Sequence, residues 1–198
     1  MTKYILNSGG LRNRPDLARI FFQEVVNGLG PKPVILICFF ALMRQEWEEK
    51  FNEYSRNYRS LSPEGVFPEF ELAFPETFSL QVKKSDVVLI QGGDDILLQY
   101  WLRQFDLPVL WSGKTVVGNS AGSNALVTCF WTCDWRTCLG GLGILPIKFL
   151  AHYKSNYGSR DPRGIIDWER AYSVLKMYGN QSMPIHALEE GKYIVIER

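Results

Sequence analysis

The chain has 198 residues, 46% of them hydrophobic, and this length and composition suit one domain with a sizeable core. Its 22 Lys and Arg residues nearly balance 21 Asp and Glu residues, so a net charge of +1 gives no general attraction for nucleic acid or anionic membranes. No apolar run is long enough to span a bilayer, and the N-terminus lacks the apolar core of a signal peptide. We therefore expect a cytoplasmic protein with a single domain over residues 1–198, monomeric or homodimeric, that binds neither nucleic acid nor membrane.

Strand and helix signals alternate along the chain. Apolar and β-branched runs predict strands, and segments with apolar residues on one face predict helices. The expected strands cover 3–7, 34–39, 69–74, 85–90, 115–117 and 147–151. The expected helices cover 15–26, 44–58, 96–104 and the segment after residue 120, and residues 183–197 are expected to form a terminal hairpin or strand pair. This alternation predicts an α/β fold with a three-layer, mostly parallel sheet and helices on both faces, whose ligand site lies at the carboxyl ends of the strands.

The pentapeptide Gly118-Asn119-Ser120-Ala121-Gly122 fits the pattern G-x-S-x-G. It stands between a predicted strand and a predicted helix, so the chain must turn sharply there. Such a turn holds its middle residue in a strained backbone conformation with the side chain exposed above the sheet. Ser120 is therefore a candidate nucleophile, and the N–H of Ala121 is expected to hydrogen-bond an oxyanion formed on an attacked carbonyl. The alternative is a glycine-rich turn that merely contains a serine.

A second glycine turn, Gly92-Gly93, follows the buried strand predicted over 85–90 and precedes a helix. Glycines in this position expose backbone N–H groups that can bind an oxyanion or a carboxylate. Gly92 or Gly93 could therefore supply the second oxyanion donor. The alternative is a tight turn capped by aspartate, because glycine and aspartate are common turn and cap residues.

A serine nucleophile needs a general base, and the chain contains only two histidines, His152 and His186. His152 follows an apolar run that would deliver its imidazole from a strand end, so it is the preferred base. Asp134 lies between Ser120 and His152 in the sequence and is the candidate carboxylate that orients the base. The alternative is a structural role for both histidines and a solvated loop position for Asp134.

These residues together resemble peptidase family S51, which includes dipeptidase E and the cyanophycinases. The resemblance is carried by the Gly92-Gly93 turn, the elbow around Ser120, and Gly143-Ile144-Leu145-Pro146 followed by His152, and it covers nearly the whole chain. It implies a class I glutamine amidotransferase-like, flavodoxin-like fold and a serine-type peptidase without a cofactor. By this resemblance Ser120 is the nucleophile, His152 the base and Asp134 falls near the family's acidic residue.

The sequence departs from dipeptidase E in the region expected to bind substrate. The dipeptidase's arginine-containing motif is absent, although Arg160, Arg163 or Arg170 could pair with a substrate carboxylate. For each arginine, a solvated surface position is the alternative. The glycine turn continues as Asp94-Asp95 where the family commonly has Asn-Thr, and a negative charge from Asp94 near an oxyanion could reduce activity or select a cationic substrate group. A requirement for an N-terminal aspartate is therefore not implied.

We expect hydrolysis of a small peptide substrate through an acyl-enzyme on Ser120. Two alternatives remain: a non-catalytic binding or regulatory protein with the same fold, and a small serine esterase. A glutamine amidotransferase is disfavoured because a cysteine would be expected at position 120. The four cysteines include no C-x-x-C pair, so free thiols and no metal site are expected.

Overall fold

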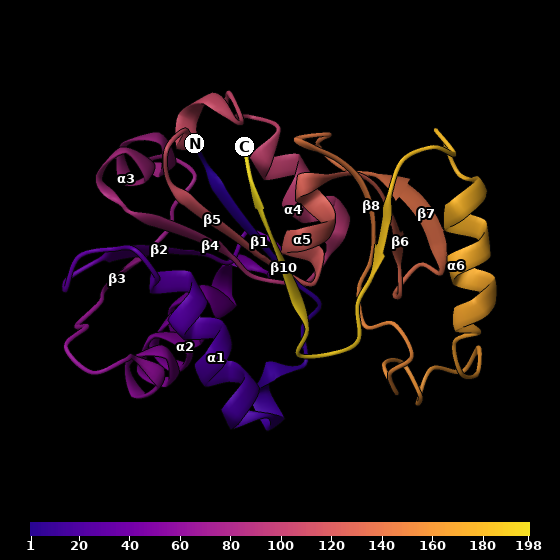
Figure 1. The fold of residues 1–198 in the computed structure, drawn as a ribbon, viewed down its shortest axis with the longest axis horizontal. Helices are drawn as coiled ribbons and strands as arrows, with labels where there is room; N and C mark the ends of the chain where they lie inside the picture. The colour runs from indigo at the N-terminus through magenta and orange to yellow at the C-terminus, as the bar shows by residue number, and fades with distance from the viewer.

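The computed structural model describes residues 1–198 and shows two β-sheets flanked by helices (Figure 1). The strands are β1 (Lys3–Asn7), β2 (Val34–Cys38), β3 (Glu69–Leu72), β4 (Val87–Ile90), β5 (Thr115–Asn119), β6 (Val127–Thr132), β7 (Thr137–Gly140), β8 (Leu145–Leu150), β9 (Ile185–Ala187) and β10 (Tyr193–Glu197). The α-helices are α1 (Pro15–Val26), α2 (Trp47–Leu61), α3 (Phe78–Lys84), α4 (Asp95–Leu102), α5 (Ala121–Leu126) and α6 (Trp168–Met177). Every strand and helix expected up to residue 151 is present, with ends that differ by a few residues.

The larger sheet has six strands in the order β10-β1-β5-β4-β2-β3, and all of its pairs are parallel except β1 with β10. Its central strands are apolar on both faces, and β4 is buried along its whole length. Helices are needed on both faces to exclude water from such strands. In Figure 1, α1 and α2 lie on one side of this sheet and α3 on the other. The predicted α/β class with a mostly parallel sheet is therefore confirmed.

A second sheet, not expected from the sequence, follows α5. It has four strands in the order β7-β6-β8-β9, with only the β6–β7 pair antiparallel. Helix α5 contacts β5 of the first sheet and β6 and β8 of the second, so it joins the two sheets. Helix α6 packs on β6 and β7, at the right of Figure 1. A smaller apolar cluster that includes Trp131, Leu150 and Leu175 lies beneath it.

The expected terminal hairpin or strand pair is not formed, because β9 and β10 belong to different sheets. Strand β9 pairs with β8 in the second sheet, and β10 pairs with β1 at the edge of the first. The short connection between them, residues 188–192, therefore crosses from one sheet to the other past the end of β1. This crossing matters for the site because it contains Glu190.

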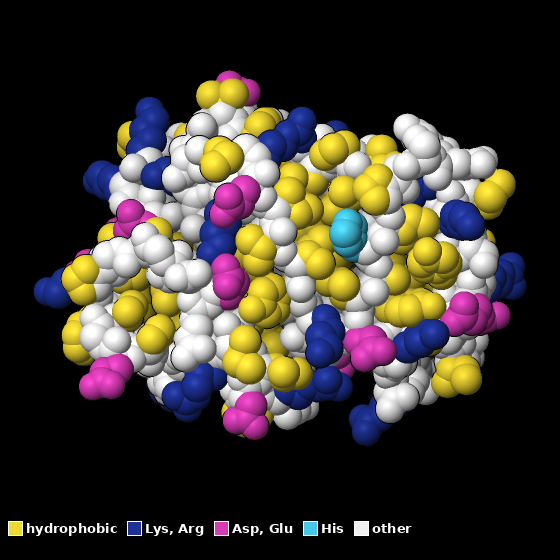
Figure 2. All heavy atoms as spheres, in the orientation of Figure 1, with side chains coloured by type: hydrophobic (Ala, Val, Ile, Leu, Met, Phe, Trp, Pro, Cys, Tyr) yellow, Lys and Arg dark blue, Asp and Glu magenta, His cyan; other side chains and the backbone are white.

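Charged side chains of both signs are scattered over the face shown in Figure 2, and they form no extended patch of one sign there. Hydrophobic side chains gather toward the middle of the same view. No helix combines the length and apolar character needed to cross a bilayer.

Candidate active site

The turn from β5 into α5 holds Ser120 in a strained conformation, with φ of 54° and ψ of −113°. A non-glycine residue in such a region costs on the order of 1–3 kcal/mol, which the surrounding packing must offset. The packing is close: a Cβ atom added to Gly122 would collide with the carbonyl oxygen of Ile90 on β4. Glycine at the end of the G-x-S-x-G pattern is therefore required for α5 to approach the sheet. The strained conformation is the one expected of a nucleophile elbow.

Ser120 and His152 are brought into contact, with 2.9 Å between Ser120 Oγ and His152 Nε2. His152 follows β8 and has a positive φ of 56°. Its backbone N–H donates to Ser8 Oγ at 2.7 Å, and the Ser8 hydroxyl donates to the carbonyl of Leu188 at 2.7 Å. A Cβ atom added to Gly9 would lie 2.6 Å from His152 Cε1, so only glycine leaves room for the imidazole there. The loop after β1 therefore positions the imidazole of His152.

The carboxylate that contacts His152 is Glu190, and not the predicted Asp134. Glu190 Oε1 lies 3.0 Å from His152 Nδ1. Asp134 is exposed and instead accepts a hydrogen bond from the Tyr157 hydroxyl at 2.9 Å. The crossing between the two sheets carries Glu190 past the end of β1, whereas the Asp134 side chain lies against Tyr157. The order of the three groups in the sequence is therefore Ser, His, Glu.

The electrostatic surroundings of His152 suit a general base. Burial lowers the pKa of His152 below its ordinary value of 6.5, and the hydrogen bond and charge of Glu190 oppose part of that effect. The imidazole is therefore neutral at pH 7. Because an ionised carboxylate only accepts hydrogen bonds, Glu190 selects the tautomer with the proton on Nδ1. Nε2 then accepts the Ser120 hydroxyl.

The two glycines expected to be oxyanion donors lie beside Ser120. A Cβ atom added to Gly92 would be 3.1 Å from Ser120 Cβ, and Gly93 lines the same small pocket as Ser120 and Ala121. The backbone N–H groups of Gly92 and Gly93 donate to no other protein group. Ala121 is the first residue of α5, where a helical N–H has no partner within the helix. These N–H groups are therefore available to an oxyanion.

Asp94 does not face this pocket. Its Oδ1 accepts the backbone N–H groups of Ile96 and Leu97, both at 2.8 Å, and so caps helix α4. The expectation that Asp94 places negative charge on the oxyanion is therefore replaced by an ordinary N-cap role. The pocket wall contains its neighbour Asp95 instead.

None of the three candidate substrate arginines lines the Ser120 pocket. Arg160 is exposed. Arg163 pairs with Asp161 and donates to the backbone carbonyl of Asp134 at 2.7 Å. Arg170 lines a separate pocket beside α6. The structure therefore offers no arginine to hold a substrate carboxylate next to Ser120.

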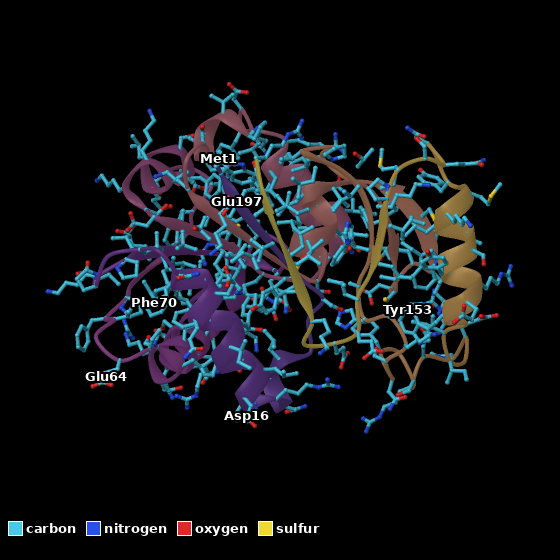
Figure 3. All side chains as sticks on the ribbon, viewed as in Figure 1. Met1, Asp16, Glu64, Phe70, Tyr153 and Glu197 are labelled. Atoms are coloured by element: carbon cyan, nitrogen blue, oxygen red, sulfur yellow. The ribbon has the colours of Figure 1, made fainter.

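Several residues that build the site were not singled out from the sequence: Ser8, Gly9, Glu190 and Tyr157. The ring of Tyr157 stacks on His152 with 4.2 Å between centroids. The Ser-Gly-Gly segment after the first strand was the available sequence signal for Ser8 and Gly9. Strand β1 lies beside β5, so the turns that follow the two strands meet at the same edge of the sheet. Tyr153, labelled in Figure 3, lies beside α6, where its ring packs against Trp168 and its hydroxyl donates to Glu169 Oε1 at 3.2 Å.

A nucleophile elbow, a neutral histidine and a carboxylate at the strand ends of an α/β fold form the arrangement of a hydrolase site. The chain belongs to peptidase family S51, whose family model matches residues 5–198. Comparison with curated proteins gives no significant match.

Two solved structures are similar to this fold. One is a peptidase from an acI-B1 Actinobacterium, with 20% identity, a TM-score of 0.66, and coverage of 99% of this chain and 83% of the other. The second is a protein of Listeria monocytogenes EGD-e described as a peptidase E, with 17% identity, a TM-score of 0.65, and coverage of 99% and 94%. At these identities the likeness establishes the shared fold, and the family membership supports a peptidase.

Proposed function

We propose that the protein is a serine-type exopeptidase that hydrolyses short peptides. The observation that carries the proposal is the continuous chain from Ser120 Oγ through His152 to Glu190, with contacts of 2.9 and 3.0 Å. A neutral, oriented imidazole within hydrogen-bond reach of a hydroxyl is what general-base activation requires. The pocket beside Ser120 has room for only a water-sized group, so we place one terminal group of a short peptide there.

In the proposed mechanism, His152 Nε2 takes the Ser120 proton while Oγ attacks the carbonyl carbon of the scissile bond. The N–H groups of Ala121 and the Gly92-Gly93 turn stabilise the oxyanion. His152 then donates that proton to the leaving amine as the C–N bond breaks, leaving an acyl-enzyme. Water, deprotonated by His152, attacks the ester and releases the acid, and the proton returns to Ser120. Glu190 orients the imidazole and stabilises its protonated form.

The experiment is labelling of the purified protein with a fluorophosphonate probe, read by intact mass. We expect the wild type to gain one label, and Ser120→Ala and His152→Ala to lose it. His186→Ala is the matched control, because His186 on β9 is the chain's other histidine and lies outside the Ser120 pocket. An unlabelled wild type, or labelling that survives Ser120→Ala, would contradict the proposal. A dipeptide library then defines the substrate.

A further inference from the structure

The pocket beside Ser120 presents negative charge without a compensating lysine or arginine. Eleven residues line it, and none of them is a lysine or an arginine. Two of them are carboxylates, and the only basic side chain among them, His152, is held neutral by burial. Neither Asp95 nor Asp134 forms an ion pair with any cationic side chain of the chain.

Asp95 is the more unusual of the two carboxylates because it is only 4% exposed. It accepts hydrogen bonds from Asn124 Nδ2 at 2.9 Å and from Thr132 Oγ1 at 2.6 Å. Burial nevertheless raises its pKa, and these two hydrogen bonds only partly oppose that effect. A buried charge is stabilised chiefly by an opposite charge, and the protein itself supplies none here.

Asn124 gives an independent indication of a ligand. It is 4% exposed, and its Oδ1 atom has no hydrogen-bond partner in the protein. The orientation of the amide is set by Asp95, because the carboxylate must face the Nδ2 donor. The unpartnered atom is therefore an acceptor. Asn124 also lies one helical turn from the nucleophile, with its backbone N–H donating to the Ser120 carbonyl at 3.0 Å.

Asp134 lines the same pocket and contacts His152 indirectly, through Tyr157. Its Oδ1 accepts the Tyr157 hydroxyl, and the Tyr157 ring stacks on His152. The nearest arginine, Arg163, pairs with Asp161 and reaches only the backbone carbonyl of Asp134. The Asp134 carboxylate therefore forms no ion pair, although the Arg163 guanidinium lies near its backbone.

We propose that this pocket binds a primary ammonium group of the substrate, held by Asp95, Asp134 and Asn124 beside Ser120. An ammonium has three donors and no acceptor, so it complements two carboxylates and an unpartnered amide oxygen. Its source is either the α-ammonium of the residue whose carbonyl is attacked or the side-chain ammonium of a basic first residue. This inference names the substrate class of the proposed peptidase and therefore rests on the proposed function.

Binding is tested first, because it needs no catalysis. Calorimetry of the wild type with L-alaninamide, L-lysinamide and their Nα-acetylated forms separates the two sources. If alaninamide binds and Nα-acetyl-alaninamide does not, the bound group is the α-ammonium. If Nα-acetyl-lysinamide still binds, the bound group is the side-chain ammonium. Asp95→Asn is expected to weaken binding of the amine by at least about tenfold, since a charge-assisted hydrogen bond is lost. Asp134→Asn, an exposed position, gives a second variant should Asp95→Asn fail to fold.

The matched control is Asp94→Asn, which removes the adjacent charge outside the pocket and keeps an amide that can cap α4. It is expected to leave amine binding within about twofold of the wild type. Equal binding of amines and their neutral acetylated forms, or equal losses in the Asp94 and Asp95 variants, would overturn the inference. Absence of amine binding would overturn it as well.

Hydrolysis is the second test. The value of kcat/KM is measured for the p-nitroanilides of lysine, norleucine and alanine, each with a free and with an acetylated α-amino group. If the α-ammonium is bound, the ratio of kcat/KM for the free and Nα-acetylated alanyl substrates should fall by at least about tenfold in Asp95→Asn. If the side-chain ammonium is bound, the ratio for the lysyl and norleucyl substrates should fall by that factor. If the fluorophosphonate labels Ser120 but amines do not bind, this inference alone fails. If amines bind but Ser120 is not labelled, the proposed function fails and the ammonium site stands.

Discussion

At the scale of single residues, His152 is subject to two opposed influences. Burial disfavours the imidazolium, and Glu190 at 3.0 Å favours it. Burial is the larger influence, so the imidazole is neutral at pH 7 and becomes protonated only at a pH below its ordinary pKa. The lowered pKa of His152 therefore predicts how the proposed peptidase activity falls as the pH is lowered.

We predict that kcat/KM of the wild type falls on the acid side with an apparent pKa below 6.5, the ordinary value for histidine. Glu190→Gln should move this limb to still lower pH, because it removes a group that raises the pKa of His152. It should also lower kcat by about 10²-fold or more, since the imidazolium formed in the transition state loses its carboxylate. The measurement is a pH–rate profile of each protein.

Glu189→Gln is the control for this substitution because Glu189 is the exposed neighbour in the same crossing. It should reproduce the wild-type profile. A limb that moves to higher pH in Glu190→Gln, or an unchanged kcat, would show that Glu190 does not position and stabilise the base.

At the scale of secondary structure, the Gly-Gly-Asp-Asp turn divides two roles between adjacent residues. Asp94 caps α4 through two backbone N–H groups, whereas Asp95, the first residue of the helix, turns into the pocket. Capping satisfies helix donors that would otherwise lack partners. The same four residues therefore start a helix, leave N–H groups near Ser120 and place a carboxylate beside it.

We predict that Asp94→Ala lowers the free energy of unfolding by about 1 kcal/mol, the usual effect of losing an N-cap. Asp94→Asn should change it by only a few tenths, because asparagine caps as well as aspartate. Urea unfolding of the three proteins measures both values. Equal destabilisation by alanine and asparagine would mean that the charge, and not the cap, is what α4 requires.

At the scale of the whole molecule, apolar packing is uneven. One cluster of 38 buried residues runs through the first sheet and across α5 to β6 and β8, whereas only 7 buried residues form the cluster beneath α6. The C-terminal end of α6 is held by the buried Lys148, whose Nζ donates to the carbonyls of Leu175 and Lys176 at 2.9 and 2.8 Å. Regions with fewer buried apolar contacts open at a lower free energy.

We predict that backbone amides of α6 exchange with solvent at least about tenfold faster than those of β4 and β5 in the native protein. Hydrogen exchange read by mass spectrometry under conditions that keep the protein folded measures this difference. The amides of β8 are the internal control. Strand β8 belongs to the sheet on which α6 packs, but its Phe149 lies in the larger cluster, so β8 should be protected more strongly than α6. Equal protection of α6 and β4 would show that the two clusters open together.

The sequence by itself determined the features that depend on neighbouring residues. Apolar periodicity specifies the strands and helices of the α/β fold, and the glycines around Ser120 specify a strand-to-helix turn, because both effects act over a few residues. The candidate pair Ser120 and His152 followed from the elbow and from the scarcity of histidine. The Gly92-Gly93 turn followed from a buried strand that ends in glycine.

Only the tertiary structure decided which charged groups face that pair. Asp134 is closer to His152 in the sequence, yet Glu190 contacts the imidazole because β9 and β10 join different sheets and their connection passes the end of β1. The candidate arginines lie outside the pocket for the same kind of reason, since long-range strand order determines which loops meet. Carboxylates and arginines are common in surface loops, so local sequence does not distinguish a solvated charge from one that is carried into the site.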